Sequence, residues 1–252
     1  MLPNPRTEMC SSQPAGETMD DVKGLFFDVG GTVFDWKNTA REEIQKLADE
    51  KGQAIDGDAF ADDWRGEMFK VHTQVRHGNL PWTNADAMHL HALENLTGSY
   101  PLLTTIDRMA LVKSTWHHLK VFAGAAEAIN RLRTRYTVVV LTILSWESIV
   151  SSSKAAKVQW DGILSCEFLG YYKPSLQAYT KGIRLLGMKP SESMMVAAHK
   201  GDLAAAQAAG MHTAYVNVPE EDNVAEGFAQ PSETNFDIEA VDFEDLCSKL
   251  QA

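Results

Sequence analysis

The chain has 252 residues, 44% of them hydrophobic, which is enough for one large domain or a core with a smaller companion. Its 34 acidic residues outnumber the 23 basic ones, and the net charge of -11 argues against nucleic acid as a partner. No stretch approaches the roughly 18 apolar residues of a membrane helix, so we expect no membrane span.

The first 21 residues are polar and contain prolines, which predicts a disordered tail over residues 1–21. The tail has no apolar run of the kind that a signal peptide needs. The three cysteines, Cys10, Cys166 and Cys247, are far apart and odd in number. This pattern suggests neither a disulfide framework nor a zinc site, and it favours the cytoplasm.

Residues 22–27 form a short apolar run that predicts a buried strand passing into a turn. From residue 39 to residue 118 the pattern is helical, with Trp64, Met68 and Val71 at helical spacing. We therefore predict an all-helical insertion after the first strand.

Strands and helices alternate from residue 124 onward. The predicted strands cover residues 137–141, 191–197 and 213–218, and the predicted helices cover 125–133, 146–157 and 202–209. Such alternation is typical of an α/β fold with a doubly wound parallel sheet, a Rossmann-like core. We assign residues 22–37 and 119–252 to this core and residues 38–118 to a helical cap.

Several polar residues follow predicted strands. Asp28, Thr142 and the segment 199–202 each come at a strand's carboxyl end. Ligands of such sheets bind beyond those ends, so we expect these side chains to face one crevice. The helical insertion would cover it, excluding water and holding the substrate.

Asp28 is a candidate nucleophile. The two glycines after it, Gly30 and Gly31, let backbone amides approach a bound anion while the turn exposes the carboxylate. A plain turn-capping aspartate is the alternative.

Lys173 precedes Pro174, which can start a helix and orient the lysine, although a solvated lysine is the alternative. His199 and Asp202 lie between an apolar strand and an alanine-rich helix. Asp202 suits an N-cap as well as a catalytic carboxylate, since the two roles are compatible.

The order of these residues resembles the haloacid dehalogenase superfamily over almost the whole chain after the tail. The residues that match its successive motifs are 28–32, Thr142, Lys173-Pro174 and Gly201-Asp202. The resemblance implies that Asp28 attacks the substrate and that Lys173 neutralises the paired carboxylates. It also implies that Thr142 hydrogen-bonds the nucleophile or the substrate's anionic group.

Gly30 discriminates between two chemistries of that superfamily. Phosphatase members place a second aspartate there as general acid, and they hold Mg²⁺ with the nucleophile and the fourth-motif carboxylates. Gly30 cannot donate a proton, and Ala206 stands where many phosphatases have another acid. A Mg²⁺-dependent small-molecule phosphatase is therefore the alternative function.

The remaining pattern is similar to the type II, L-2-haloacid dehalogenases, which need no metal or other cofactor. Trp64-Arg65 resembles the pair whose arginine receives the departing halide, as suits a large, weakly hydrated anion. Tyr179 follows Lys173 by six positions and Asp202 follows it by 29, as in that branch. The resemblance implies that Arg65, Tyr179, Thr142 and Gly30 form the substrate-binding site. For Arg65 the alternative is a surface residue of the cap, and for Tyr179 it is a residue that only packs between helix and sheet.

The chain also departs from that branch. Thr142-Ile143 replaces the Ser-Asn common in the second motif, and Gly30 replaces an aromatic. In the fourth motif, Ala197 and His199 replace serine and asparagine. We expect Gly30 to enlarge the site, with Trp146 or Trp82 refilling part of the space.

The preferred hypothesis is hydrolysis of short 2-haloacids through an ester on Asp28, with the halide released to Arg65. Water would be activated through Asp202 or His199. For His199 the alternative, which the sequence favours equally, is a histidine that only makes structural hydrogen bonds. A non-catalytic binding protein that retains the fold is a further alternative. A homodimer is compatible with the helical pattern.

Overall fold

The computed structural model describes residues 21–221 and 235–252, so the predicted tail lies almost entirely outside the described residues. A parallel six-stranded sheet forms the core, in the order β5-β4-β1-β6-β7-β8. The strands are β1 (Gly24–Phe27), β4 (Thr137–Thr142), β5 (Gly162–Ser165), β6 (Ser193–Ala197), β7 (His212–Val216) and β8 (Ile238–Ala240). The predicted doubly wound parallel sheet is confirmed.

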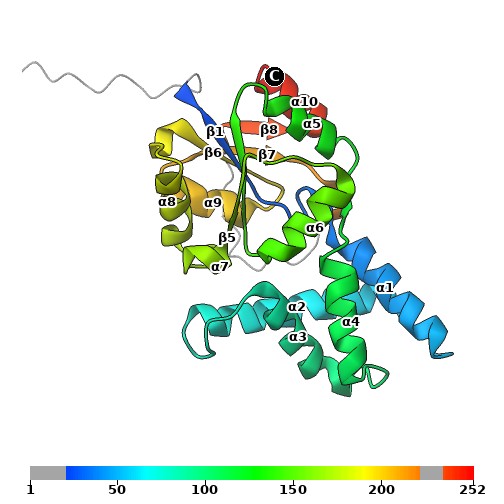
Figure 1. The fold of residues 1–252 in the computed structure, drawn as a ribbon. Helices are drawn as coiled ribbons and strands as arrows, with labels where there is room; N and C mark the ends of the chain where they lie inside the picture. Colours follow the sequence, from blue (N-terminus) through cyan, green and yellow to red (C-terminus); the bar gives the residue numbers. More distant parts are fainter. Residues whose placement is uncertain (1–20, 222–234) are drawn as a thin grey trace, which may run out of the picture.

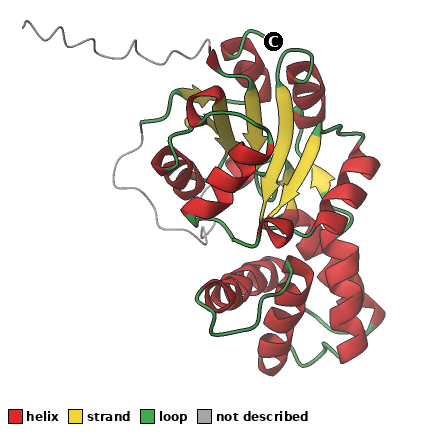
Figure 2. Cartoon of the chain, turned by 60° about the vertical axis from the view of Figure 1, so that its left-hand side comes forward, coloured by secondary structure: helices red, strands yellow, loops and turns green. Residues whose placement is uncertain are grey.

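Helices cover both faces of the sheet (Figures 1 and 2). One face carries α5 (Ala125–Leu132), α6 (Trp146–Ala156) and α10 (Phe243–Lys249). The other carries α8 (Leu176–Leu185) and α9 (Lys200–Ala208), and the short α7 (Cys166–Leu169) follows β5. β1 and β4 are buried at every position but one, as expected of central strands that are covered on both faces. This burial explains why their sequences are continuous apolar runs.

Four helices between β1 and β4 lie below the carboxyl end of the sheet (Figure 1). They are α1 (Trp36–Glu50), α2 (Gly57–Arg76), α3 (Ala85–Asn95) and α4 (Thr105–Trp116), and we call them the helical cap. Two short antiparallel strands, β2 (Phe34–Asp35) and β3 (Lys120–Val121), join where the chain leaves and re-enters the core. The predicted division at residues 38 and 118 stays a prediction.

Local sequence explains why the longest cap helix forms. The carboxylate of Asp56 accepts hydrogen bonds from the backbone N–H groups of Asp58 and Ala59, which caps the start of α2. Its buried residues then recur every three or four positions, including Trp64, Arg65 and Met68. This spacing points Arg65 into the molecule.

The structure adds elements that periodicity did not indicate. β5 and β8 are short edge strands, and the pairing of β2 with β3 involves only two residues on each side. Among the described residues, no helix is both long and apolar enough to cross a membrane.

Candidate active site

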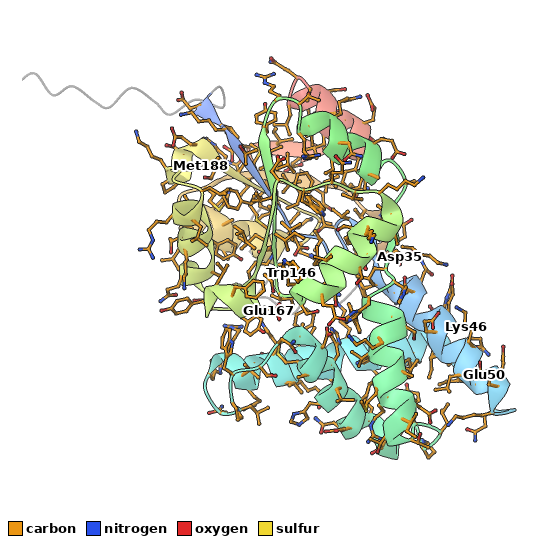
Figure 3. All side chains as sticks on the ribbon, viewed as in Figure 1. Asp35, Lys46, Glu50, Trp146, Glu167 and Met188 are labelled. Carbon is orange, nitrogen blue, oxygen red and sulfur yellow. The ribbon has the colours of Figure 1, made fainter. Side chains whose placement is uncertain are left out.

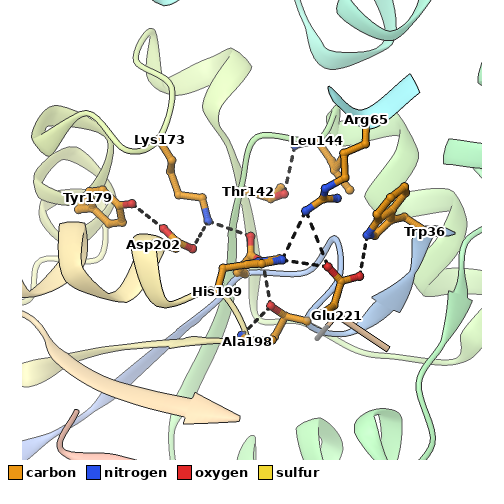
Figure 4. Close-up of polar contacts among 12 residues, drawn as sticks. Trp36, Arg65, Thr142, Leu144, Lys173, Tyr179, Ala198, His199, Asp202 and Glu221 are labelled. Atoms are coloured by element: carbon orange, nitrogen blue, oxygen red, sulfur yellow. Dashed lines mark hydrogen bonds and ion pairs between the residues drawn. The ribbon is translucent and has the colours of Figure 1, made fainter. Parts of the chain in front are cut away.

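The predicted site residues meet at the carboxyl ends of the central strands (Figure 4). Asp28 follows β1, Thr142 ends β4, and His199 and Asp202 follow β6. Lys173 comes from the loop between α7 and α8, and its peptide bond to Pro174 is cis. Arg65 reaches the same place from α2 of the helical cap.

Asp28 has protein donors on both carboxylate oxygens. Lys173 Nζ lies 2.9 Å from Oδ1, while Thr32 Oγ1 and His199 Nδ1 lie 2.8 and 3.1 Å from Oδ2. Burial raises the pKa of the Asp28 carboxyl, but the charges of Lys173 and His199 outweigh that effect and hold it well below its usual range. Asp28 is therefore an ionised carboxylate.

Lys173 joins Asp28 to a second buried carboxylate. Its Nζ donates to Asp202 Oδ2 at 2.6 Å, and the Lys173 side chain is only 1% exposed. Burial lowers the pKa of Lys173, but the carboxylates of Asp202 and Asp28 outweigh it and raise that pKa above its ordinary value. The lysine stays charged between the two aspartates.

Tyr179 contacts Asp202. Its hydroxyl donates to Asp202 Oδ1 at 2.5 Å, and burial next to that carboxylate raises the pKa of Tyr179, which keeps it a donor. The tyrosine is fully buried and is not among the residues that line the cavity beside Asp28. The structure thus places it on Asp202, whereas the sequence suggested a substrate contact.

His199 lies between two carboxylates. Its Nδ1 faces Asp28, and its Nε2 lies 3.2 Å from Glu221 Oε2. Burial lowers the pKa of His199, but the hydrogen bonds to Asp28 and Glu221 outweigh it and raise the pKa to about 9. At neutral pH the imidazole is therefore protonated, with one N–H directed at each carboxylate.

Arg65 is buried between aromatic rings. Its guanidinium carbon lies 4.3 Å from the ring centroid of Trp36 and 5.1 Å from that of Phe69. Its Nη2 lies 3.8 Å from Glu221 Oε2 and 3.4 Å from His199 Nε2. Stacked guanidinium groups are well suited to a weakly hydrated anion.

Glu221 and Trp36 belong to this network, and the sequence analysis missed both as site residues. Glu221 ends the short 3-10 helix Pro219–Glu221 after β7, and Trp36 Nε1 donates to its Oε1 at 2.6 Å. Its side chain is 5% exposed. The sequence signal that could have identified Glu221 was its position just after a predicted strand, because that strand ends at the same edge of the sheet as the strand before Asp28.

The cavity beside Asp28 is small, about 30 Å³. Its lining is mostly apolar and comprises Asp28, Gly30, Arg65, Met68, Phe69, Trp116, Thr142, Ile143, Leu144, Lys173 and His199. The Thr142 hydroxyl accepts a hydrogen bond from the Leu144 N–H at 3.1 Å, while the hydroxyl that bonds Asp28 is that of Thr32.

Leu144 fills the space at Gly30. A Cβ added to Gly30 would lie 3.3 Å from Leu144 Cδ1, which is a tight contact. Trp146 is 45% exposed and lies near Glu167 (Figure 3). Trp82 is 47% exposed and stacks on Tyr172. Neither tryptophan lines the cavity, so the expected refilling by Trp146 or Trp82 is wrong.

A family model described as haloacid dehalogenase-like hydrolase matches residues 22–210. The chain belongs to this family. It is therefore a hydrolase, with the family's α/β fold. No curated protein matches the sequence of this haloacid dehalogenase-like hydrolase significantly.

Several solved structures of haloacid dehalogenases are also similar to this chain. The L-2-haloacid dehalogenase PA0810 is 30% identical, with a TM-score of 0.83 over 91% of this chain and 99% of that one. The defluorinating L-2-haloacid dehalogenase Rha0230 is 27% identical, with a TM-score of 0.84 over 92% and 96%. The L-2-haloacid dehalogenase from Xanthobacter autotrophicus with chloropropionic acid covalently bound is 17% identical over 92% and 99%, with a TM-score of 0.76, and shares the fold.

Proposed function

We propose that this hydrolase removes the halogen from short 2-haloacids through an ester on Asp28. The observation that carries the proposal is an ionised Asp28 facing a small, mostly apolar cavity that is also lined by the stacked guanidinium of Arg65. A carboxylate nucleophile and a cation for the leaving anion are the two groups that displacement at a carbon–halogen bond requires.

In the first step, an oxygen of Asp28 attacks the carbon that bears the halogen. The C–O bond of the ester forms as the carbon–halogen bond breaks, and the halide leaves with the electron pair toward Arg65. Lys173 and His199 keep Asp28 ionised beforehand, and Lys173 stays bound to Asp202 throughout.

In the second step, water attacks the carbonyl carbon of the Asp28 ester. His199 is better placed than Asp202 to take the proton, because His199 lines the cavity and contacts Asp28. Both oxygens of Asp202 accept hydrogen bonds from Lys173 and Tyr179 instead. His199 is cationic beside the Asp28 carboxylate and becomes a base once esterification removes that negative charge.

The size of the cavity favours the shortest acids. About 30 Å³ is room for roughly two or three water molecules. We therefore propose chloroacetate, fluoroacetate and 2-chloropropionate as substrates, with longer chains excluded by Leu144 and Met68.

We also propose that the reaction needs no metal. A divalent cation at this site would need free carboxylate oxygens. Those of Asp28 and Asp202 already accept hydrogen bonds from Lys173, Thr32 and Tyr179, and Gly30 offers no further carboxylate. The donor set therefore does not fit the Mg²⁺ site of the phosphatase alternative.

A single turnover in oxygen-18-labelled water tests the ester mechanism. Water oxygen enters the Asp28 carboxyl during ester hydrolysis, so mass spectrometry should find the label in the peptide that contains Asp28. An unlabelled Asp28 with labelled product would contradict the proposal.

A halide-release screen tests the substrate class. Fluoro-, chloro- and bromoacetate and both 2-chloropropionate enantiomers should be compared with small phosphoesters, each with EDTA and with Mg²⁺. We expect EDTA-resistant halide release. Phosphate release that depends strictly on Mg²⁺ would instead select the phosphatase.

A further inference from the structure

We propose that Glu221 is a positioning residue for His199, holding the imidazole against Asp28 and stabilising its protonated form while water attacks the ester. This inference rests on the proposed function and adds a residue to its second step. Glu221 lies on the loop after β7, far in sequence from Asp28 and His199.

The carboxylate of Glu221 is fixed from several elements. Trp36 at the start of α1 donates to Oε1 at 2.6 Å, and His199 before α9 faces Oε2 at 3.2 Å. A Cβ on Gly31 would lie 2.6 Å from the Glu221 carboxylate, so this group rests directly on the nucleophile's turn. Such contacts leave the carboxylate little freedom to move away from His199.

Glu221 acts through His199 and not on the substrate. Arg65 and His199 line the cavity, whereas Glu221 is not among the lining residues. The imidazole of His199 lies between two carboxylates, with Nδ1 3.1 Å from Asp28 Oδ2 and Nε2 3.2 Å from Glu221 Oε2. Figure 4 shows the contact between His199 and Glu221. A base that is itself oriented by a third group is the arrangement of known hydrolytic triads.

Glu221 also balances charge. His199 Nε2 and Arg65 Nη2 are only 3.4 Å apart, and two cations at that distance repel each other. Glu221 Oε2 lies 3.2 Å from the first and 3.8 Å from the second. Among the described residues, Asp28 also faces His199, and Lys173 neutralises Asp28 on its other oxygen.

The protons balance with His199 as the carrier. Once Asp28 is esterified, His199 releases a proton to the solvent and becomes neutral, and this is the one proton that the overall hydrolysis sets free along with the halide. Water then bonds to the ester carbonyl carbon and gives His199 a proton, which passes to the departing alkoxide as its bond to Asp28 breaks. The Asp28 carboxylic acid finally protonates His199 and so restores the resting ion pair.

The test compares Glu221→Gln with Glu220→Gln, an exposed neighbour in the same turn. In single turnovers with chloroacetate, we expect E221Q to slow ester hydrolysis by about 10- to 100-fold, part of the factor that a positioned general base contributes. Halide release should change less, so the Asp28 ester should accumulate and be detected by mass spectrometry. E220Q should match the wild type, and Glu221→Asp should recover part of the rate.

The pH profile separates positioning from a merely structural role. Loss of the Glu221 charge lowers the pKa of His199, so the acid limb of ester hydrolysis should move to lower pH in E221Q. NMR of the His199 ring should show the same direction in the resting enzyme, without substrate.

An unchanged hydrolysis rate, acid limb and ring titration in E221Q would overturn the inference alone. Wild-type enzyme that released no halide and left Asp28 unlabelled would overturn the proposed function, while the ring titration would still report on Glu221 and His199. If E221Q fails to fold, E221D carries the rate comparison, because it keeps the charge but shortens the side chain, and ester hydrolysis at the wild-type rate in E221D would overturn the inference.

Discussion

His199 stands where the resemblance to the dehalogenase branch implies an asparagine, and an imidazole at this position offers different chemistry beside Asp28. An asparagine amide orients a water molecule but does not take its proton. In the proposed reaction, an imidazole between Asp28 and Glu221 does both, since its charge depends on whether Asp28 is a carboxylate or an ester. One residue thus couples the two steps of the proposed reaction.

The first prediction concerns the stability that His199 provides. Its pKa is raised by folding, so its contribution is fully present below the unfolded value of 6.5 and is lost as pH rises through about 9. In that interval the folded state binds more protons than the unfolded state, and stability falls with pH. Compared with His199→Gln, the wild type should lose about 3 kcal/mol more of its unfolding free energy between these limits.

Urea unfolding of both proteins at several pH values measures this difference. His77→Gln, an exposed histidine of the helical cap, is the control and should follow the wild type. A difference between wild type and H199Q that did not depend on pH would show that His199 is not protonated in the folded protein.

The second prediction concerns Arg65. In Arg65→Lys the charge remains, but an ammonium neither stacks flat on Trp36 nor presents the planar fork of N–H groups that a guanidinium offers an anion. We expect kcat/KM for chloroacetate to fall by about 10²- to 10³-fold, the usual effect of losing one donor to a developing anion. Steady-state halide release checks this, and equal activity of R65K would mean that positive charge alone serves the leaving group.

At the scale of elements, the turn after β1 brings the nucleophile and Glu221 together. Gly31 has φ +84, a conformation that disfavours residues with a Cβ, and its missing side chain is the space that Glu221 occupies. The turn therefore needs glycine both for its backbone and for this close approach.

The third prediction separates those two reasons. Gly31→Ala combines backbone strain with a 2.6 Å contact to Glu221, whereas Gly52→Ala, at φ +64 with nothing within 4 Å, has strain alone. We expect G52A to cost about 1 kcal/mol and leave activity unchanged. G31A should cost more and should slow ester hydrolysis, as E221Q does. Equal losses of stability in the two variants and full activity of G31A would contradict this, as measured by urea unfolding and halide release.

The sequence predicts this turn and the strands around it because their signal is local. An apolar run that ends in Asp28 and two glycines predicts the strand and the carboxylate that follows it. The expected exposure of that carboxylate is wrong, because the structure buries Asp28 beneath the helical cap. Arg65 and Lys173 are recognised by their spacing within motifs. Glu221 has no such local signal, since its role depends on Trp36 and His199 reaching it through the tertiary fold. Leu144 at Gly30 was missed for the same reason.

At the scale of the whole molecule, the alternation of elements predicts the core and its helical insertion but not how the two are joined. Asp86 near the start of α3 accepts hydrogen bonds from Ser145 and Ser148 of the core at 2.8 and 3.2 Å. Its other oxygen lies 2.7 Å from His117 Nε2. Asp86 in the cap is therefore tied to the start of α6, next to the end of β4.

The last prediction tests that connection. Asp86→Ala removes the shared acceptor of Ser145, Ser148 and His117, all of which are buried, and should lower the unfolding free energy by about 1–3 kcal/mol. Asp86→Asn keeps one acceptor oxygen and should lose less. Glu43→Ala, which removes an exposed pair with Lys46, should lose less than about 1 kcal/mol. Because the cap carries Arg65, D86A should also reduce halide release, with the three variants in the same order as in urea unfolding. If D86A were as stable and active as E43A, the cap would be held in place by its other contacts with the core, such as the hydrogen bond from the Tyr172 hydroxyl to the Thr83 carbonyl.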